Sequence, residues 1–340
     1  MSMAVASAVV SLAGLQEANW ARPAAGGESC LSAKAAGWWA SPQTPGLRAA
    51  YEWPNPYGPG LCLVTDHYAI HTTLMTADVL SRLPGFMESA HRAYAAQLPC
   101  AIDPRTRSAI YVLAGRDQWE ALTRRLTGTQ AELFLKIKEG AYCFNGSCVG
   151  YDIGPDRTLA ALGHEGWHQF TSRHFALRLP SWLDEGIAMT FESFVCVDGR
   201  FEFHTGDNAY RLRSLRDAAS GGNALPLGVL LSTSPGEVMA TDRSEQVQVL
   251  YSQFYALVRF LQEAGDGRYL SGYRRLVAEG LQGRWPLEQR DREIAADRNR
   301  PMTVEWNRVV GPQLFRYYVT DDLDGIQTEY LAFCTRLAAR

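Results

Sequence analysis

The sequence predicts an α+β fold, in which a mixed half with a β-sheet and an edge hairpin is followed by a mainly helical half. Up to residue 154, short β-branched and aromatic runs alternate with amphipathic stretches, whereas from residue 155 the apolar spacing is mostly helical. We therefore expect one domain over residues 48–340, divided into a mixed α/β subdomain (48–154) and a mainly helical subdomain (155–340).

Residues 1–30 stand apart from this domain. Residues 4–15 form a small apolar run of the length of a secretory hydrophobic region, but no Lys or Arg precedes Arg22. The segment is expected to be either a flexible terminus or a degenerate signal peptide.

The mixed half shows strand and helix signals in turn. Residues 61–72 (LCLVTDHYAIHT) predict one or two strands, and residues 110–113 predict another. Residues 76–98 have apolar side chains at helical spacing and end before Pro99, and residues 117–126 have the pattern of a further helix.

Residues 140–151 predict a β-hairpin, because Asn145-Gly146 is a preferred two-residue turn. The turn places Cys143 opposite Cys148 in a non-hydrogen-bonded pair, where side chains approach most closely. A disulfide between them is geometrically possible, and its formation would favour a secreted or periplasmic location. The seven cysteines include no CxxC pair, so a cysteine-based zinc cluster is not expected.

The helical half has one main interruption, at residues 195–204, where Asp198-Gly199 separates two strand-like runs. Residues 247–261 predict an amphipathic helix, and residues 269–279 and 327–339 predict two more. The charged residues 288–300 are expected to form a solvated helix face or a loop.

Charge and hydropathy argue against two classes of function. The 33 basic and 36 acidic side chains give a formal net charge of −3, which is not the basic footprint of a nucleic-acid-binding protein. No apolar run reaches the length of a membrane span.

The segment His164-Glu165-Gly166-Trp167-His168 carries the main functional prediction. Two histidines four residues apart lie on one face of a helix, so both imidazoles can bind one cation. Glu165 lies beside them and can act as the general base of a zinc hydrolase. We therefore predict one Zn²⁺ ion held by His164 and His168 at the junction of the two halves. The alternative is a pair of surface histidines with a solvated glutamate.

Catalytic zinc sites have a third protein ligand and one position open for water. The sequence offers Glu185 on a second helix, for which Ser181 is the expected N-cap, with Asp184 completing a capping-box-like pair. Glu192 lies seven residues after Glu185, nearly two turns later on the same face. We predict Glu185 as the third ligand and Glu192 as the acceptor of a ligand histidine's free N–H. In isolation, either carboxylate would be a solvated helix residue.

The HExxH segment followed by WLDEGIAMTFE (182–192) resembles the gluzincin metallopeptidases, and is most similar to their peptidase-MA-like group. The resemblance implies a thermolysin-like α+β fold, a zinc-dependent peptidase activity and the ligand role for Glu185. It also implies a tyrosine that donates to the developing oxyanion. Tyr251 fits best, because it lies off the apolar stripe of its helix, and Tyr255 is the second choice. A packed core tyrosine is the alternative for Tyr251.

The aminopeptidase branch of this family has a glutamate that binds the substrate's α-amine, and Gly140-Ala141-Tyr142 stands in its place here without one. These three residues are predicted to form an edge strand that binds an extended peptide. The sequence therefore favours an endopeptidase over an aminopeptidase, and we expect a peptide or protein as its substrate.

Three other interpretations are open. His174 lies where the metzincins have a third histidine ligand, but Thr171 replaces the glycine that their chain turn needs, and a continuing helix points His174 away. The fold could also serve a zinc- or peptide-binding module without turnover, or a protein whose histidines bind no metal. The remaining histidines, His67, His71, His91 and His204, are expected to be structural or on the surface.

Overall fold

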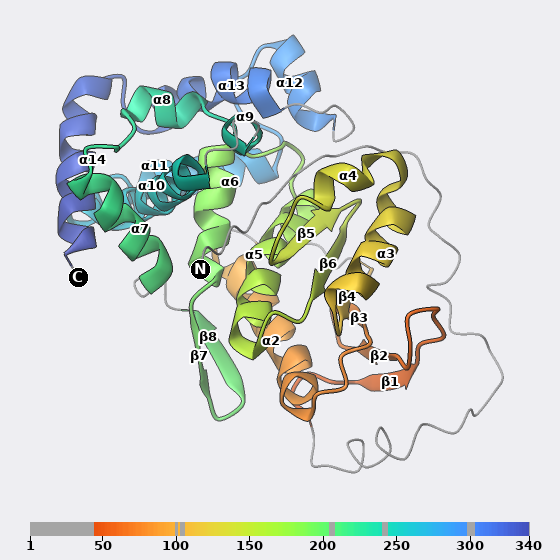
Figure 1. Ribbon diagram of the computed structural model, residues 1–340. Coiled ribbons are helices and arrows are strands. Elements are labelled where there is room, and N and C mark those ends of the chain that lie inside the picture. The colour runs from red at the N-terminus through yellow and green to blue at the C-terminus, as the bar shows by residue number, and fades with distance from the viewer. Residues whose placement is uncertain are drawn as a thin grey trace.

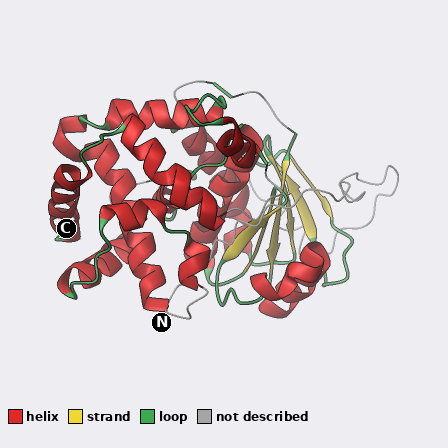
Figure 2. Ribbon diagram, turned by 90° about the horizontal axis from the view of Figure 1, so that it is seen from above, coloured by secondary structure: helices red, strands yellow, loops and turns green. Residues whose placement is uncertain are grey.

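The computed structural model describes residues 44–98, 101–102, 106–203, 208–239, 244–297 and 303–339. It has the predicted α+β architecture, with a six-stranded sheet in the first half and helices in the second (Figure 1). Seen from above, the sheet stands at one side of the molecule and most of the helices gather at the other (Figure 2). The predicted segment 1–30 lies outside the described residues, and the division at residue 154 stays a prediction.

The sheet has the strand order β1-β2-β3-β4-β6-β5. Strands β3 and β4, and β4 and β6, are parallel, and the other neighbours are antiparallel. The strands are β1 (Ala49–Glu52), β2 (Leu61–Val64), β3 (Tyr68–Thr72), β4 (Ser108–Leu113), β5 (Ala141–Phe144) and β6 (Ser147–Tyr151). Strand β5 is therefore an edge of the sheet, as the hairpin prediction requires.

Helices cover both faces of the sheet. Helices α2 (Ala77–Ala96) and α5 (Pro155–His174) share one apolar cluster with the inward side chains of β2, β3 and β4. Helix α3 (Arg116–Thr127), the short η1 (Gly128–Gln130) and α4 (Ala131–Phe134) lie on the other side, where Trp119 and Phe134 pack with Val149 of β6. The parallel strands are thus buried on both faces, as such strands usually are.

The hairpin of β5 and β6 turns at Asn145 and Gly146, whose φ angles of 48° and 72° are those of a type I′ turn. This turn fixes the predicted register, with Cys143 directly opposite Cys148. Both cysteines are free thiols in the structure. Helix α5 is fastened to the turn by Gln169, whose Nε2 donates to the carbonyls of Gly146 and Ala109, each at 2.7 Å.

The described part of the second half consists of helices and one small two-stranded hairpin near its start. Its elements are α6 (Ser181–Ala188), η2 (Met189–Phe191), β7 (Phe194–Val197), β8 (Arg200–Phe203), α7 (Ala209–Ser220), α8 (Leu227–Ser232), α9 (Pro235–Met239), α10 (Ser244–Glu263), η3 (Ala264–Gly267), α11 (Leu270–Leu281), α12 (Gln289–Ala296), α13 (Thr303–Tyr318) and α14 (Leu323–Ala338). Within the described helices, length and apolar character nowhere combine to give a segment that could span a bilayer.

Helix α10 is the centre of the helical half, because α6, α7, α11 and α14 all contact it. Its approach to α6 is close at Gly186. A Cβ atom on Gly186 would lie 2.5 Å from Cγ2 of Val258 and 2.6 Å from the carbonyl oxygen of Phe254. Glycine is required there, and the contact fixes the position of the neighbouring Glu185.

The start of α6 differs from the prediction. Pro180, not Ser181, is the N-cap residue, and it makes no side-chain capping bond. The amide of Ser181 instead donates to Oδ1 of Asn307, at 2.6 Å, from helix α13. The predicted capping box was wrong because this tertiary contact serves the helix end, which leaves Asp184 available for another partner.

Candidate metal centre

Helix α5 begins at Pro155 and has both histidines on one side, in its buried middle part. Two glycines let this helix come close to its neighbours. A Cβ on Gly163 would lie 2.5 Å from the carbonyl oxygen of Phe191, and one on Gly166 would overlap the hydroxyl of Tyr94. Tyr94 uses that hydroxyl to donate to the carbonyl of Gly163, at 2.6 Å. These contacts hold α5 against α2 and η2.

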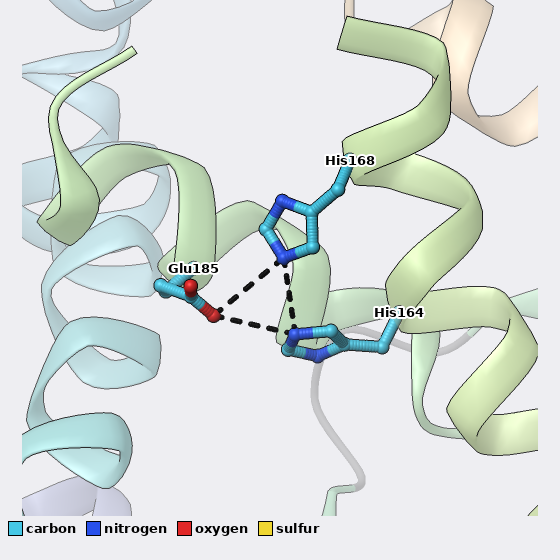
Figure 3. Close-up of side chains that lie close together, drawn as sticks. All are labelled: His164, His168 and Glu185. Atoms are coloured by element: carbon cyan, nitrogen blue, oxygen red, sulfur yellow. Dashed lines mark hydrogen bonds and ion pairs between the residues drawn. The ribbon is translucent and has the colours of Figure 1, made fainter. Parts of the chain in front are cut away.

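His164 and His168 of α5 and Glu185 of α6 converge on one point (Figure 3). Nε2 of His164 lies 3.2 Å from Nε2 of His168 and 3.3 Å from Oε2 of Glu185, and the third separation, from His168 to Glu185, is 3.6 Å. All three side chains are buried. Among the described residues, this is the group of three His, Cys, Asp or Glu donors that could hold a metal ion.

The spacing of the three donor atoms fits a tetrahedral zinc ion. Ligand atoms 2.0–2.1 Å from a tetrahedral centre are about 3.3–3.4 Å apart, close to the three separations in this group. Two imidazoles and one carboxylate are also donor types that zinc accepts, and they leave the fourth position open. The three residues could therefore hold one metal ion.

Each histidine has a carboxylate on its other ring nitrogen. Nδ1 of His164 lies 2.9 Å from Oε1 of Glu192, and Nδ1 of His168 lies 3.2 Å from Oδ2 of Asp184. The second oxygen of Asp184 accepts a hydrogen bond from Nε1 of Trp167, at 2.8 Å. Because each Nδ1 faces an acceptor, both Nε2 atoms are turned toward the shared point.

Glu192 is itself held from the helical half. Arg211 donates from Nε to Oε2 at 2.8 Å and from Nη2 to Oε1 at 2.6 Å, and Asn208 donates to Oε2 at 2.8 Å. Sequence reasoning found Glu192 but missed Asp184, Asn208 and Arg211. The local pattern around Asp184 indicated a helix cap, and Asn208 and Arg211 belong to no recognisable motif.

The charges in this group support one another. Burial lowers the pKa of His164, but hydrogen bonds to Glu185 and Glu192 outweigh burial and raise it to about 9. The pKa of His168 is likewise raised well above its usual value, because Asp184 and Glu185 outweigh the effect of burial. Burial raises the pKa of Glu185, yet the two imidazoles lower it to about 2. The carboxylates around the two imidazoles thus stabilise positive charge at this place.

Glu165 is different from the other carboxylates. Its side chain is completely buried beside the two histidines, and neither of its oxygens has a hydrogen-bond partner among the described residues. Burial raises the pKa of Glu165 to about 7, since the nearby histidines offset only part of that cost. A buried carboxylate without partners is costly, and such a group points to a ligand or a reaction.

The side chain of Tyr251 is buried at the centre of the helical half. Its side chain is 1% exposed, and its ring lies 5.5 Å from the guanidinium carbon of Arg211 and 6.4 Å from the ring of Phe254. Tyr255 is also buried and accepts a hydrogen bond from Nη1 of Arg259, at 3.0 Å. Tyr251 therefore lies next to the Arg211–Glu192 pair that contacts His164.

The predicted substrate strand is an edge strand in the structure. Ala141 and Tyr142 belong to β5, and Gly140 precedes it with a φ of 124°. The side chains of Ala141 and Tyr142 are buried, and the hydroxyl of Tyr142 contacts Oγ1 of Thr123, at 3.1 Å. Among the described strands, β5 pairs with β6 alone.

The other histidines lie elsewhere. His174 ends α5 and packs against Phe170, with ring centroids 4.5 Å apart, and it is not part of the donor group. His67 contacts Glu88 and stacks on His91, and His71 stacks on Tyr111. His204 lies outside the described residues.

Comparison with known proteins gives no match, either among protein-family models or among curated proteins. Fold and site alone therefore define the class. The chain is an α+β protein with a buried His164–His168–Glu185 group that could hold a metal ion at the junction of its two halves.

Proposed function

We propose that the chain is a zinc-dependent peptidase of the gluzincin type, with His164, His168 and Glu185 as ligands of one Zn²⁺ ion and Glu165 as general base. The observation that carries the proposal is the carboxylate of Glu165. It is fully buried next to the three donors, and neither oxygen has a partner among the described residues. A purely structural histidine pair does not require such a group, whereas a hydrolase does.

A zinc ion in this group would supply Lewis-acid polarisation of the scissile carbonyl and an activated water. Glu165 takes the proton of the attacking water and transfers it to the leaving amine, first as base and then as acid. Glu192 and Asp184 orient the two imidazoles through their Nδ1 atoms, 2.9 Å and 3.2 Å away.

Two further roles belong to this proposal. Tyr251 would donate to the oxyanion, supported by its position beside the Arg211–Glu192 pair. Edge strand β5, with Ala141 and Tyr142 at its start and Gly140 directly before it, would bind an extended peptide by main-chain hydrogen bonds. Since no glutamate lies at this place to bind an α-amine, we favour an endopeptidase over an aminopeptidase.

The test compares wild type with Glu165→Gln and Glu185→Ala. Zinc content is measured by elemental analysis, and hydrolysis is measured on denatured casein and mixed peptides, with and without a chelator. We expect one zinc and chelator-sensitive hydrolysis in wild type, zinc without hydrolysis in Glu165→Gln, and weakened zinc binding in Glu185→Ala. Full activity of Glu165→Gln would contradict the proposed base, and a wild type that binds no zinc would contradict the whole assignment.

The burial of the group favours a second candidate function. Because His164 and Glu165 are completely buried, the same residues could serve a zinc-binding module without turnover. The casein assay separates the two candidates, since such a module would contain zinc and hydrolyse none of the substrates in either variant or wild type.

A further inference from the structure

Arg211 is a buried arginine that the proposed reaction does not use directly. It is 1% exposed, and both ends of its guanidinium bind the carboxylate of Glu192, at 2.6 Å and 2.8 Å. Oε1 of Glu192 is shared, because it accepts from Arg211 and also lies 2.9 Å from Nδ1 of His164. One oxygen atom thus joins the guanidinium of α7 to an imidazole of α5.

The guanidinium is held on several sides. Its carbon lies 5.3 Å from the ring centroid of Tyr210 and 5.5 Å from that of Tyr251. Asn208 caps α7 by accepting from the amide of Arg211, at 3.2 Å, and donates both to Glu192 and to the carbonyl of Met189, at 3.0 Å. The start of α7 is therefore bound to the end of η2 through the very carboxylate that contacts His164.

A buried ion pair such as Arg211–Glu192 loses several kcal/mol of hydration free energy per ion, and a protein with an apolar pair of the same shape is often as stable. The geometry of the pair instead indicates a role in orienting Glu192. A bidentate arginine fixes both the position and the plane of a carboxylate. A carboxylate fixed in this way fixes in turn the orientation and the tautomer of the histidine that it accepts from.

We infer that Arg211 is a positioning residue for the metal centre: through Glu192, it holds His164 with Nδ1 bonded and Nε2 directed at the ion. The inference rests on the proposed function, because it assigns Arg211 to the zinc group. It also connects zinc affinity to the docking of α7, because Arg211 of α7 binds the carboxylate of Glu192.

The alternative is that Arg211 only attaches α7 to the rest of the fold. Both roles predict a loss of stability when Arg211 is replaced, so stability cannot distinguish them. Zinc affinity, measured at a temperature where the variants are folded, does distinguish the two roles. A purely structural contact would leave the orientation of His164, and so the zinc affinity, unchanged.

The experiment measures zinc affinity by competition with a chromogenic chelator, in wild type, Arg211→Met, Arg211→Lys, Glu192→Gln and the double variant Arg211→Met/Glu192→Gln. The matched control is Arg178→Met, since Arg178 is also buried and donates to the main-chain carbonyl of Asp297, at 2.9 Å. Folding of each variant is checked by circular dichroism, and the absorption of the cobalt-substituted proteins reports the geometry of the ligands.

We expect Arg211→Met to weaken zinc binding roughly 10- to 100-fold, the usual effect of losing an outer contact of a ligand. Arg211→Lys should retain part of the affinity, because lysine keeps the charge but not the two-point contact. The double variant should bind zinc no more weakly than the weaker single variant, since both changes act on one contact. Arg178→Met should bind zinc as wild type does.

Unchanged zinc affinity in Arg211→Met, or additive losses in the double variant, would overturn the inference and leave the proposed function standing. Should Arg211→Met fail to fold, Arg211→Lys decides, since wild-type affinity and an unchanged cobalt spectrum in that variant would also overturn it. A wild-type protein that binds no zinc is a different result, because it contradicts the proposed function itself and not only the role of Arg211.

Discussion

The side chain of Asp184, the residue immediately before Glu185, lies 3.2 Å from Nδ1 of His168, on the opposite side of the imidazole from the shared metal point. Its other oxygen accepts from Nε1 of Trp167, at 2.8 Å. One turn of α6 therefore supplies both a candidate ligand and the residue that orients another ligand.

We predict that Asp184→Asn lowers zinc affinity roughly 10-fold or more, because an amide is a weaker acceptor for the imidazole N–H than a carboxylate. The measurement is chelator competition on the folded variant. Asp66→Asn is the control, since Asp66 is exposed and pairs with Arg48. Equal affinity of Asp184→Asn and wild type would show that His168 does not depend on this contact.

The contact of α6 with α10 gives a second prediction. Gly186→Ala puts a methyl group 2.5–2.6 Å from Val258 and from the carbonyl oxygen of Phe254, so the helices must separate. We expect a loss of about 1–3 kcal/mol in the free energy of unfolding, and weaker zinc binding because Glu185 moves with its helix. Denaturant unfolding and chelator competition measure the two effects.

Gly228→Ala is the matched control for this change. Gly228 also lies in a helix, α8, and an added Cβ there would meet no atom within 4 Å. Alanine should leave zinc binding as it is and should stabilise the helix slightly. If Gly186→Ala also left zinc binding and the free energy of unfolding unchanged or improved, the result would contradict the close contact between α6 and α10.

Local sequence patterns were sufficient to predict that His164 and His168 share one helix face, and to predict the register of the β5–β6 hairpin. Histidines four residues apart share a helix face whatever surrounds them, and the Asn145-Gly146 turn fixes its hairpin register through its own backbone angles. Such features depend on short-range geometry, so they can be predicted from the residues alone.

Other features depend on which elements meet, and no local pattern contains that information. Arg211 reaches Glu192 only because α7 packs against the end of η2. Tyr251 lies off the apolar stripe of α10 and is nevertheless buried, because helices contact α10 on several sides. An apolar stripe marks the most apolar side of a helix and does not show that the other sides are open.

The hairpin cysteines give a third prediction. Cys143 is half-buried and lies opposite the buried Cys148. With oxidised glutathione, the Cys143 thiolate forms a mixed disulfide and releases one glutathione, and Cys148 then displaces the second, which leaves a Cys143–Cys148 bond and two reduced glutathiones. We expect the second step to be slow, because burial raises the pKa of the Cys148 thiol.

Peptide mapping without reductant measures this bond. Cys143→Ser should abolish it, whereas Cys196→Ser, at an exposed position of β7, should leave it unchanged. Two free thiols in the wild-type hairpin after prolonged treatment would contradict the prediction.

The charge of Glu165 gives a prediction about stability and pH. In the metal-free folded protein the pKa of Glu165 is about 7, against 4.5 for an unperturbed glutamate, chiefly because burial disfavours the charged form. Below pH 4.5 the carboxyl is neutral in both the folded and the unfolded protein, so Glu165 does not lower the free energy of unfolding there. The cost appears as the pH rises from 4.5 through 7, and it is fully present above 7.

Glu165→Gln removes this charge at every pH. We expect the metal-free variant to match wild type near pH 4.5 and to exceed its free energy of unfolding at pH 8, by an amount on the order of a few kcal/mol. Urea unfolding of chelator-treated protein at the two pH values measures the difference. Glu132→Gln, at an exposed position of α4, should show no such change between the two pH values. A stability difference between Glu165→Gln and wild type that is the same at both pH values would mean that Glu165 is not a buried carboxylate of raised pKa, and the reason for assigning it as the base would be lost.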